Sequence, residues 1–365
     1  MSRSHSFFLK LPQNLTHYNL VEHPGFTQAL QDGMSQGDIS LFLPLEMVAK
    51  VWSELTMADL IVYGGTSKAN YAIVQASIRS SLEHLLLPFV RSGGVNQFLS
   101  VLSTERAVIS GSMALFFMLS CSLTGVQSGQ GWGPADMDVY EPNDEDRRSN
   151  IVGYLIVEEG YKEVGSKVSA LGEGYNLHSR IKKVTRLRRG RHIVDVIITV
   201  SPDAIAAIMG FHSTPVMNWI SGDGVFSAYP QLLSKKRGLV NSMGLTLPNF
   251  SPKLPPANVR MCLKKYFNRG FDIRRNPSCW PGDKHVCCSS VNCPHTVRSM
   301  LDHGTMYYRF KKSDELAGIH MTGGIDYKGP YCSQYILYWS IGGPSCEQRH
   351  RVTRPFIMHR GEADD

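Results

Sequence analysis

The sequence lacks long apolar runs. None of the hydrophobic stretches in its 365 residues approaches the roughly 20 residues that a helix needs to cross a bilayer, so we expect no membrane partner. The N-terminal stretch MSRSHSFFLKLPQNLTHYNL lacks acidic residues, yet its apolar part is too short and too interrupted for a secretory signal. We therefore expect an intracellular protein, in the cytoplasm or the nucleus, whose eight cysteines remain thiols.

Acidic residues are also absent from one strongly basic segment. Charged residues make up 19% of the chain and apolar residues 42%, which is a globular composition. Much of the formal net charge of +7 lies in RIKKVTRLRRGRH, residues 180–192, which is predicted to form two β runs joined at Arg189-Gly190. A localised basic strip favours an anionic partner, either a nucleotide or RNA. The alternative is the solvated face of a hairpin.

The first part of the chain is predicted to be a leader followed by helices. Residues 1–38 are polar and irregular. Pro44 can open a first helix, because its missing N–H needs no partner there. Thr56 can cap a second helix, which Gly64-Gly65 would end, and a third helix is expected to start near Ser67.

This helical segment resembles an F-box. The stretch LPLEMVAKVWSELTMADLIVYGGTSKANYAIV keeps the expected order of Leu43-Pro44, Glu46, Leu55, Asp59-Leu60 and Ser67-Lys68. In that family the three-helix motif docks on the Skp adaptor of a ubiquitin ligase. The resemblance implies an F-box-like helical unit over residues 39–92, which binds a Skp-type adaptor through residues 40–90. The alternative is three core helices of an ordinary domain.

A Gly-Ser pair marks the first candidate ligand site. Gly111-Ser112 follows a predicted buried strand, AVIS, and precedes a predicted apolar helix, MALFFMLSCSL. Backbone N–H groups at the start of a helix bind anions, and glycine allows a phosphate to come close. The serine hydroxyl adds a hydrogen-bond donor. The alternative is an ordinary turn with a helix cap.

Three aspartates in predicted strands form the second candidate site. Asp136 and Asp138 lie two residues apart in DMDVYEP, so their carboxylates point to the same face of the strand. Mg²⁺ prefers such oxygen ligands together with nucleotide phosphates. Asp195 lies among β-branched residues in HIVDVIITV, where burial is costly unless the carboxylate is paired or binds a metal. An exposed strand end or an edge strand would leave these carboxylates solvated.

The order of these features resembles the DNA-polymerase-β-like nucleotidyltransferase superfamily. Its signature is Gly-Ser at a helix start, two acids on the next strand and a third carboxylate on a later strand. The resemblance covers residues 105–200 and implies that Asp136, Asp138 and Asp195 are catalytic and bind two Mg²⁺ ions. It also implies that Gly111 and Ser112 hold the triphosphate of an NTP. An unknown acceptor would then attack the α-phosphorus in line, and pyrophosphate would leave.

The chain departs from the superfamily pattern in one interval. Twenty-three residues separate Ser112 from Asp136, more than the superfamily usually has, and the surplus TGVQSGQGWGP is predicted to be a loop. The alternative function is an F-box-type adaptor that uses an inactive nucleotidyltransferase-like domain for recognition. Segment 211–241, FHSTPVMNWISGDGVFSAYPQLLSKKRGLVN, is similar to fungal proteins with a nucleotidyltransferase-like core.

Strands and helices mix through residues 105–211 and predict an α/β or α+β domain. The resemblance to the nucleotidyltransferase superfamily implies an α+β core with a mixed sheet. We expect a nucleotidyltransferase-like core over residues 93–255 and a helical, cysteine-rich cap over residues 256–365. SPDAIAAIMGF is predicted to be a helix capped by Ser201 with Pro202 at its first position. The terminal TRPFIMHRGEADD is predicted to be frayed.

The predicted cap contains the main cysteine and histidine cluster. Thiolates and imidazoles suit tetrahedral Zn²⁺, but the spacing matches no specific zinc-finger pattern, so we expect free cysteines in preference to a Zn²⁺ site. The cluster consists of Cys279, His285, Cys287, Cys288, Cys293, His295 and His303.

Overall fold

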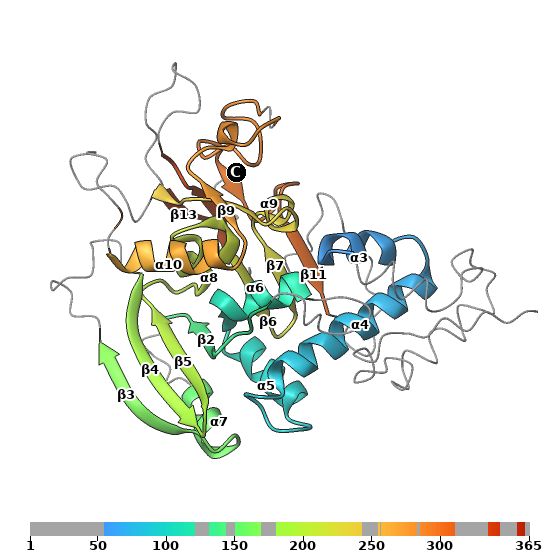
Figure 1. Ribbon diagram of the computed structural model, residues 1–365. Coiled ribbons are helices and arrows are strands. Elements are labelled where there is room, and N and C mark those ends of the chain that lie inside the picture. Colours follow the sequence, from blue (N-terminus) through green and yellow to red (C-terminus); the bar gives the residue numbers. More distant parts are fainter. Residues whose placement is uncertain are drawn as a thin grey trace, which may run out of the picture.

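The computed structural model in Figure 1 describes residues 55–120, 131–143, 150–168, 180–242, 255, 257–282, 285–310, 335–343 and 356–361. The predicted leader, the helix predicted to open at Pro44 and most of the TGVQSGQGWGP loop lie outside these residues.

The described residues form the following helices and strands, in chain order. The α-helices are α3 (Met57–Gly64), α4 (Lys68–Leu86), α5 (Val95–Thr104), α6 (Gly111–Ser120), α7 (Asn150–Val157), α8 (Ile205–Met209), α9 (Pro230–Ser234) and α10 (Ala257–Asn268). Two 3₁₀ turns are η5 (Thr214–Val216) and η7 (Pro277–Cys279). The strands are β1 (Val108–Ser110), β2 (Asp136–Glu141), β3 (Lys162–Val168), β4 (Ile181–Arg189), β5 (His192–Thr199), β6 (Asn218–Ser221), β7 (Gly224–Ser227), β8 (Arg237–Leu239), β9 (Asp272–Arg274), β10 (Arg298–Ser299), β11 (Met306–Arg309), β12 (Tyr335–Ser340) and β13 (Phe356–Gly361).

The predicted helix signals around α3 and α4 are confirmed. Thr56 and Asp59 form a capping box, in which the Thr56 hydroxyl accepts from the Asp59 N–H at 3.3 Å and the Asp59 carboxylate accepts from the Thr56 N–H at 3.0 Å. Gly65 caps the C-terminal end of α3, and the Ser67 hydroxyl caps α4 by accepting from the Asn70 N–H. Local capping chemistry therefore sets both helix starts.

The main sheet has eight strands in the order β11-β7-β6-β1-β2-β5-β4-β3. Strands β2 and β5 run parallel, whereas the other neighbouring pairs are antiparallel, so the expected α+β class with a mixed sheet is confirmed. The predicted hairpin is present, with Gly190 at φ +59° between β4 and β5. Strand β11 comes from the segment expected to form a separate cap, yet it adds an edge strand to this sheet.

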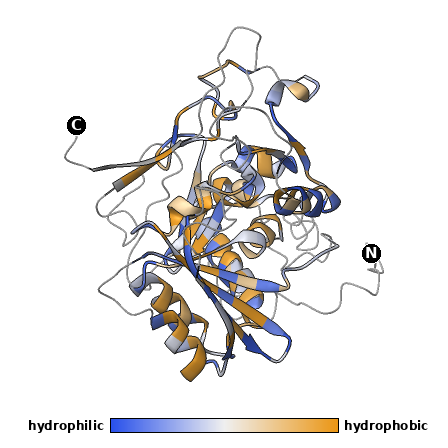
Figure 2. Cartoon of the chain, turned by 90° about the vertical axis from the view of Figure 1, so that its left-hand side faces the viewer, coloured by the Kyte–Doolittle hydropathy of each residue, from blue (hydrophilic) through white to orange (hydrophobic). Residues whose placement is uncertain are grey.

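Two apolar clusters lie on the two faces of the sheet. On one face, α3 to α7 pack in a single cluster that includes Leu60, Phe98, Phe117 and Val139. On the other face, α8, α9 and the second sheet β10-β12-β13 pack around Trp219 and other large side chains. Because both faces are covered, the central strands β1, β6 and β7 are buried along their whole length. Figure 2 shows hydrophobic residues in the strands of the sheet and in the helices beside it. None of the described helices combines the length and apolar character needed to span a bilayer.

Two local predictions were wrong. Helix α8 begins at Ile205, because Ser201 and Asp203 form a turn instead of a helix start: the Asp203 carboxylate accepts from the Ile205 N–H at 2.8 Å. The segment predicted to be frayed contains β13, which pairs along its length with β12. Pairing with a distant strand, which the local sequence does not reveal, orders these residues.

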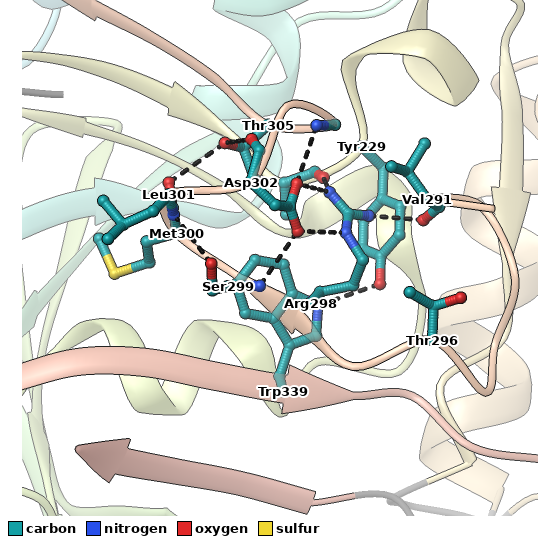
Figure 3. A network of polar contacts seen from close by, with 12 residues as sticks. Tyr229, Val291, Thr296, Arg298, Ser299, Met300, Leu301, Asp302, Thr305 and Trp339 are labelled. Carbon is teal, nitrogen blue, oxygen red and sulfur yellow. Dashed lines mark hydrogen bonds and ion pairs between the residues drawn. The ribbon is translucent and has the colours of Figure 1, made fainter. Parts of the chain in front are cut away.

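A buried arginine joins the second sheet to the rest of the fold (Figure 3). Arg298 is 1% exposed, and its guanidinium donates to both carboxylate oxygens of Asp302 at 2.6 and 2.8 Å. It also donates to the carbonyls of Val291 and Ala228 and lies 4.7 Å above the Tyr229 ring. Burial alone raises the pKa of Asp302, but the Arg298 hydrogen bonds and charge outweigh it and lower that pKa overall.

Arg298→Met should destabilise the protein by about 3–5 kcal/mol, because it leaves a partly buried carboxylate and two carbonyls without their donor. Denaturant unfolding measures this loss. Arg188→Met, at an exposed position of β4, is the control and should change stability by less than about 0.5 kcal/mol. The double variant Arg298→Met/Asp302→Leu should recover part of the loss. Equal stabilities of Arg298→Met and Arg188→Met would contradict the structural role of this network.

Candidate functional site

The candidate site is a row of side chains that crosses four strands. Asp138 of β2 lies opposite Ser110 of β1 on one side and Asp195 of β5 on the other, and Asp195 lies opposite Arg186 of β4. Residues directly opposite each other point to the same face of a sheet. The parallel register of β2 and β5 therefore places two of the three predicted carboxylates next to each other.

The Gly111 turn packs directly against this row. Gly111 follows β1, starts α6 and has φ +68°, a conformation that glycine adopts without strain. A Cβ atom on Gly111 would lie 2.6 Å from Oδ2 of Asp138, so a larger residue would displace the carboxylate. Ser112 is buried in the first turn of α6. The long interval before Asp136 therefore does not separate Gly111 from the acidic strand.

Asp195 is already paired. Its two carboxylate oxygens accept from Nε and a terminal nitrogen of Arg186 at 2.8 and 2.6 Å. The Asp195 side chain is 9% exposed and that of Arg186 is 52% exposed, so the pair joins a buried carboxylate to a solvated guanidinium. These hydrogen bonds raise the pKa of Arg186. A buried aspartate is costly unless it is paired or binds a metal, and Asp195 is paired.

Within the part of the chain that the structure describes, Asp138 has no partner comparable to Arg186. Its pKa is raised to about 7, first by burial and then by the negative charges of Asp136 and Asp195. Lys265 and Arg186 lower it only in part. Burial and like charge both disfavour the ionised form, so Asp138 is the member of the row whose charge lacks compensation.

Helix α10 and the residue that follows it, Arg269, supply two cations that the sequence patterns did not assign to the site. The charges of Lys265 and Arg269 act on Asp138 and Asp136, respectively. The Arg269 guanidinium lies 3.7 Å from the centre of the Trp132 ring, and one of its terminal nitrogens is buried with no hydrogen-bond partner in the described part of the chain. The helix itself was predicted, but the effect of Lys265 and Arg269 on the aspartates of β2 depends on tertiary structure and has no local signal.

The basic hairpin is partly occupied by internal contacts. Arg186 pairs with Asp195, and Arg189 pairs with Glu159, whose side chain is 2% exposed, at 3.1 Å. Arg188 and Arg191 are exposed, and Lys182, also exposed, donates to the Asn143 side chain. A surface for RNA would therefore use only part of the predicted strip.

The described residues do not form a complete metal centre. Within them, no group of three or more His, Cys, Asp or Glu side chains could hold a metal ion. The oxygen donors of Asp136 and Asp138 nevertheless suit Mg²⁺, which proteins often hold with one or two carboxylates and substrate phosphates. In the cysteine-rich segment, Cys279, Cys287, Cys288 and Cys293 are thiols, and the sulfurs of Cys287 and Cys288 lie 3.8 Å apart.

Comparisons with models of protein families, with curated proteins and with solved structures found no match to this chain.

Asp138→Asn should change the pH dependence of stability. The folded-state pKa of about 7 lies above the ordinary value of 3.8, so the folded protein holds a proton that the unfolded chain has released between these values. The contribution of Asp138 to stability should therefore fall as pH rises from 4 to 7, and the stability of wild type minus that of Asp138→Asn should show this fall. His212, whose pKa is lowered to about 4 by burial, contributes in the opposite direction in both proteins and cancels in this difference. At pH 8 the variant should be about 1–3 kcal/mol more stable in the absence of divalent cations, because it removes an uncompensated charge.

Urea unfolding from pH 4 to 8 in EDTA measures this effect. Glu163→Gln, at an exposed position of β3, is the matched control and should keep the wild-type slope. A slope that persists unchanged in Asp138→Asn would show that Asp138 is not the uncompensated group.

Proposed function

We propose that this protein is a Mg²⁺-dependent nucleotidyltransferase that acts on an NTP and an unknown acceptor. The observation that carries the proposal is the contact of Gly111 with Asp138 in a row that also contains Asp195. A helix start and paired acidic residues are each common features. Their direct contact across β1 and β2 places backbone N–H groups that can bind a phosphate beside a buried carboxylate that a cation would stabilise.

In this proposal Asp136 and Asp138 hold the cation. They are two residues apart on β2, and the raised pKa of Asp138 reports a carboxylate that a divalent cation would stabilise in its ionised form. Bound Mg²⁺ would neutralise charge on the triphosphate during the transfer. Asp195 reaches a cation only if Arg186 releases it. The sequence-based expectation of three carboxylates on two ions therefore requires this ion pair to open.

Phosphate binding is assigned to two sources of positive charge. Gly111 and Ser112 begin α6, where backbone N–H groups and the helix dipole favour an anion. Lys265 in α10 and Arg269 just after it act on the same acidic residues, and one nitrogen of Arg269 without a partner among the described residues has a donor to offer. In the reaction the acceptor oxygen forms a bond to the α-phosphorus, the bond to the β-phosphate oxygen breaks, and pyrophosphate leaves with the negative charge.

Asp136→Asn and Asp138→Asn should each abolish Mg²⁺-dependent transfer of label from α-³²P-labelled NTPs, with a loss of at least about 100-fold. Arg269→Met should raise KM for the NTP more than it lowers kcat, because it removes a phosphate donor. Glu163→Gln should retain full activity. Labelling that is equal in wild type, Asp136→Asn and Asp138→Asn would exclude the proposed reaction.

The second candidate is the F-box-type adaptor with an inactive nucleotidyltransferase-like domain. The confirmed starts of α3 and α4 are the observation that favours it. Against it, the apolar faces of these helices pack into the same cluster as α5 and α6, and Val62 is the exposed large apolar residue of α3.

An adaptor should capture a Skp-type protein in a binding assay with purified components. Val62→Asp should weaken that binding by at least about tenfold if α3 forms the contact, because it places a charge in an apolar interface. Gln231→Glu, at an exposed position of α9, is the control. No binding of the Skp-type protein to the wild-type chain removes the adaptor candidate.

A further inference from the structure

A second candidate site lies away from the acidic row. A pocket with a volume of about 300 Å³ opens between α9, the start of β8 and the segment from η7 to His303. It shares no lining residue with the row formed by Ser110, Asp138, Asp195 and Arg186. The nucleotidyltransferase proposal leaves this pocket without a role.

The pocket is lined by basic and hydroxyl side chains. Lys235 and Arg237 come from the junction of α9 and β8, and His285 and His303 come from the opposite wall. Ser289 and Ser290 lie on the same wall, and no aspartate or glutamate is among the lining residues that the structure describes. Such a lining favours an anion with several oxygen acceptors.

Internal contacts hold the walls of the pocket in place. The Arg237 guanidinium lies 5.0 Å from the centre of the Trp280 ring, and the Trp280 indole donates to Asp272 at 2.9 Å. On the opposite wall, the Ser290 hydroxyl accepts from the Val286 N–H at 2.8 Å. Arg298 donates to the Val291 carbonyl, so the buried network in Figure 3 also anchors this wall. Sites for small ligands are usually preformed in this way.

One lining residue, His285, has a buried ring nitrogen without a hydrogen-bond partner among the described residues. Nδ1 of His285 lies 3.3 Å from the Ser278 hydroxyl, whereas its Nε2 is buried and has no hydrogen-bond partner among the described residues. A buried polar atom without a partner is costly, and a ligand oxygen would satisfy it. The Ser290 hydroxyl, whose oxygen accepts from Val286, keeps its own proton to donate.

We propose that this pocket binds the phosphate group of a small molecule. Lys235 and Arg237 supply the opposite charge, while His285 and Ser290 supply oriented polar groups. The volume is at the lower limit of the pockets that hold small ligands, so a phosphorylated metabolite-sized molecule fits and a nucleic-acid chain does not. Leu232 and Pro277 add an apolar part of the wall for the rest of such a molecule.

Isothermal titration calorimetry on the full chain tests this assignment, with EDTA present to prevent metal-dependent binding at the acidic row. Orthophosphate and glucose 6-phosphate are the probes, and glucose is the uncharged comparison. Lys235→Met and His285→Asn should each weaken phosphate binding by at least tenfold. Lys162→Met, which removes an exposed charge on β3, should leave it unchanged.

The two probes distinguish the source of the phosphate. Tighter binding of glucose 6-phosphate than of orthophosphate indicates a phosphorylated organic ligand, and equal binding indicates the free anion. Lys235 is exposed, so Lys235→Met should fold as wild type does, and near-UV circular dichroism verifies this. Absence of binding by both probes overturns the proposal. Equal losses in Lys235→Met and Lys162→Met also overturn it, because they would indicate net charge alone.

Discussion

The parallel pairing of β2 with β5 is the constraint on which the candidate site depends. It places the carboxylates of Asp138 and Asp195 side by side on one face of the sheet. Arg186 donates two hydrogen bonds to Asp195, whereas it acts on Asp138 only through its charge. The close approach of Gly111 confines the other carboxylate. The register of β2 with β5 and the close approach of Gly111 thus place the uncompensated Asp138 carboxylate beside the start of α6.

This arrangement explains how a site of this kind is tolerated in a stable fold. The two apolar clusters hold the sheet from both faces, and the Arg298 network fixes the second layer. Stability from these parts offsets the unfavourable charge on Asp138. Ligand-binding sites commonly contain charged groups that the protein does not fully compensate, because a ligand of opposite charge can supply the missing interaction.

Prediction from the sequence succeeded where local chemistry decides the structure. The capping signal at Thr56, the helix start near Ser67, the DMDVYEP strand and the hairpin at Gly190 were all evident from short-range patterns. It failed where distant segments decide. The pairing of β13 with β12, the addition of β11 to the main sheet and the approach of Arg269 to Asp136 depend on contacts that no local pattern records.

The candidate site shows the same division. The sequence identified Gly111, Asp138 and Asp195, and the structure brings these three residues together. The sequence also indicated that a buried Asp195 requires a partner. That this partner is Arg186 follows from the register of β4 with β5. The phosphate-type pocket was not foreseen at all. Its lining comes from α9, β8 and the cysteine-rich segment, and these segments come together only through tertiary structure.

The most direct measurement is the pKa of the Asp138 carboxyl group, followed by ¹³C NMR with and without Mg²⁺. The assignment comes from the loss of one resonance in Asp138→Asn. We predict a pKa of about 7 in EDTA, because of burial and the charges of Asp136 and Asp195, and a pKa well below that value in millimolar Mg²⁺. A pKa at the ordinary value in EDTA, or a raised pKa that Mg²⁺ does not change, would contradict the account.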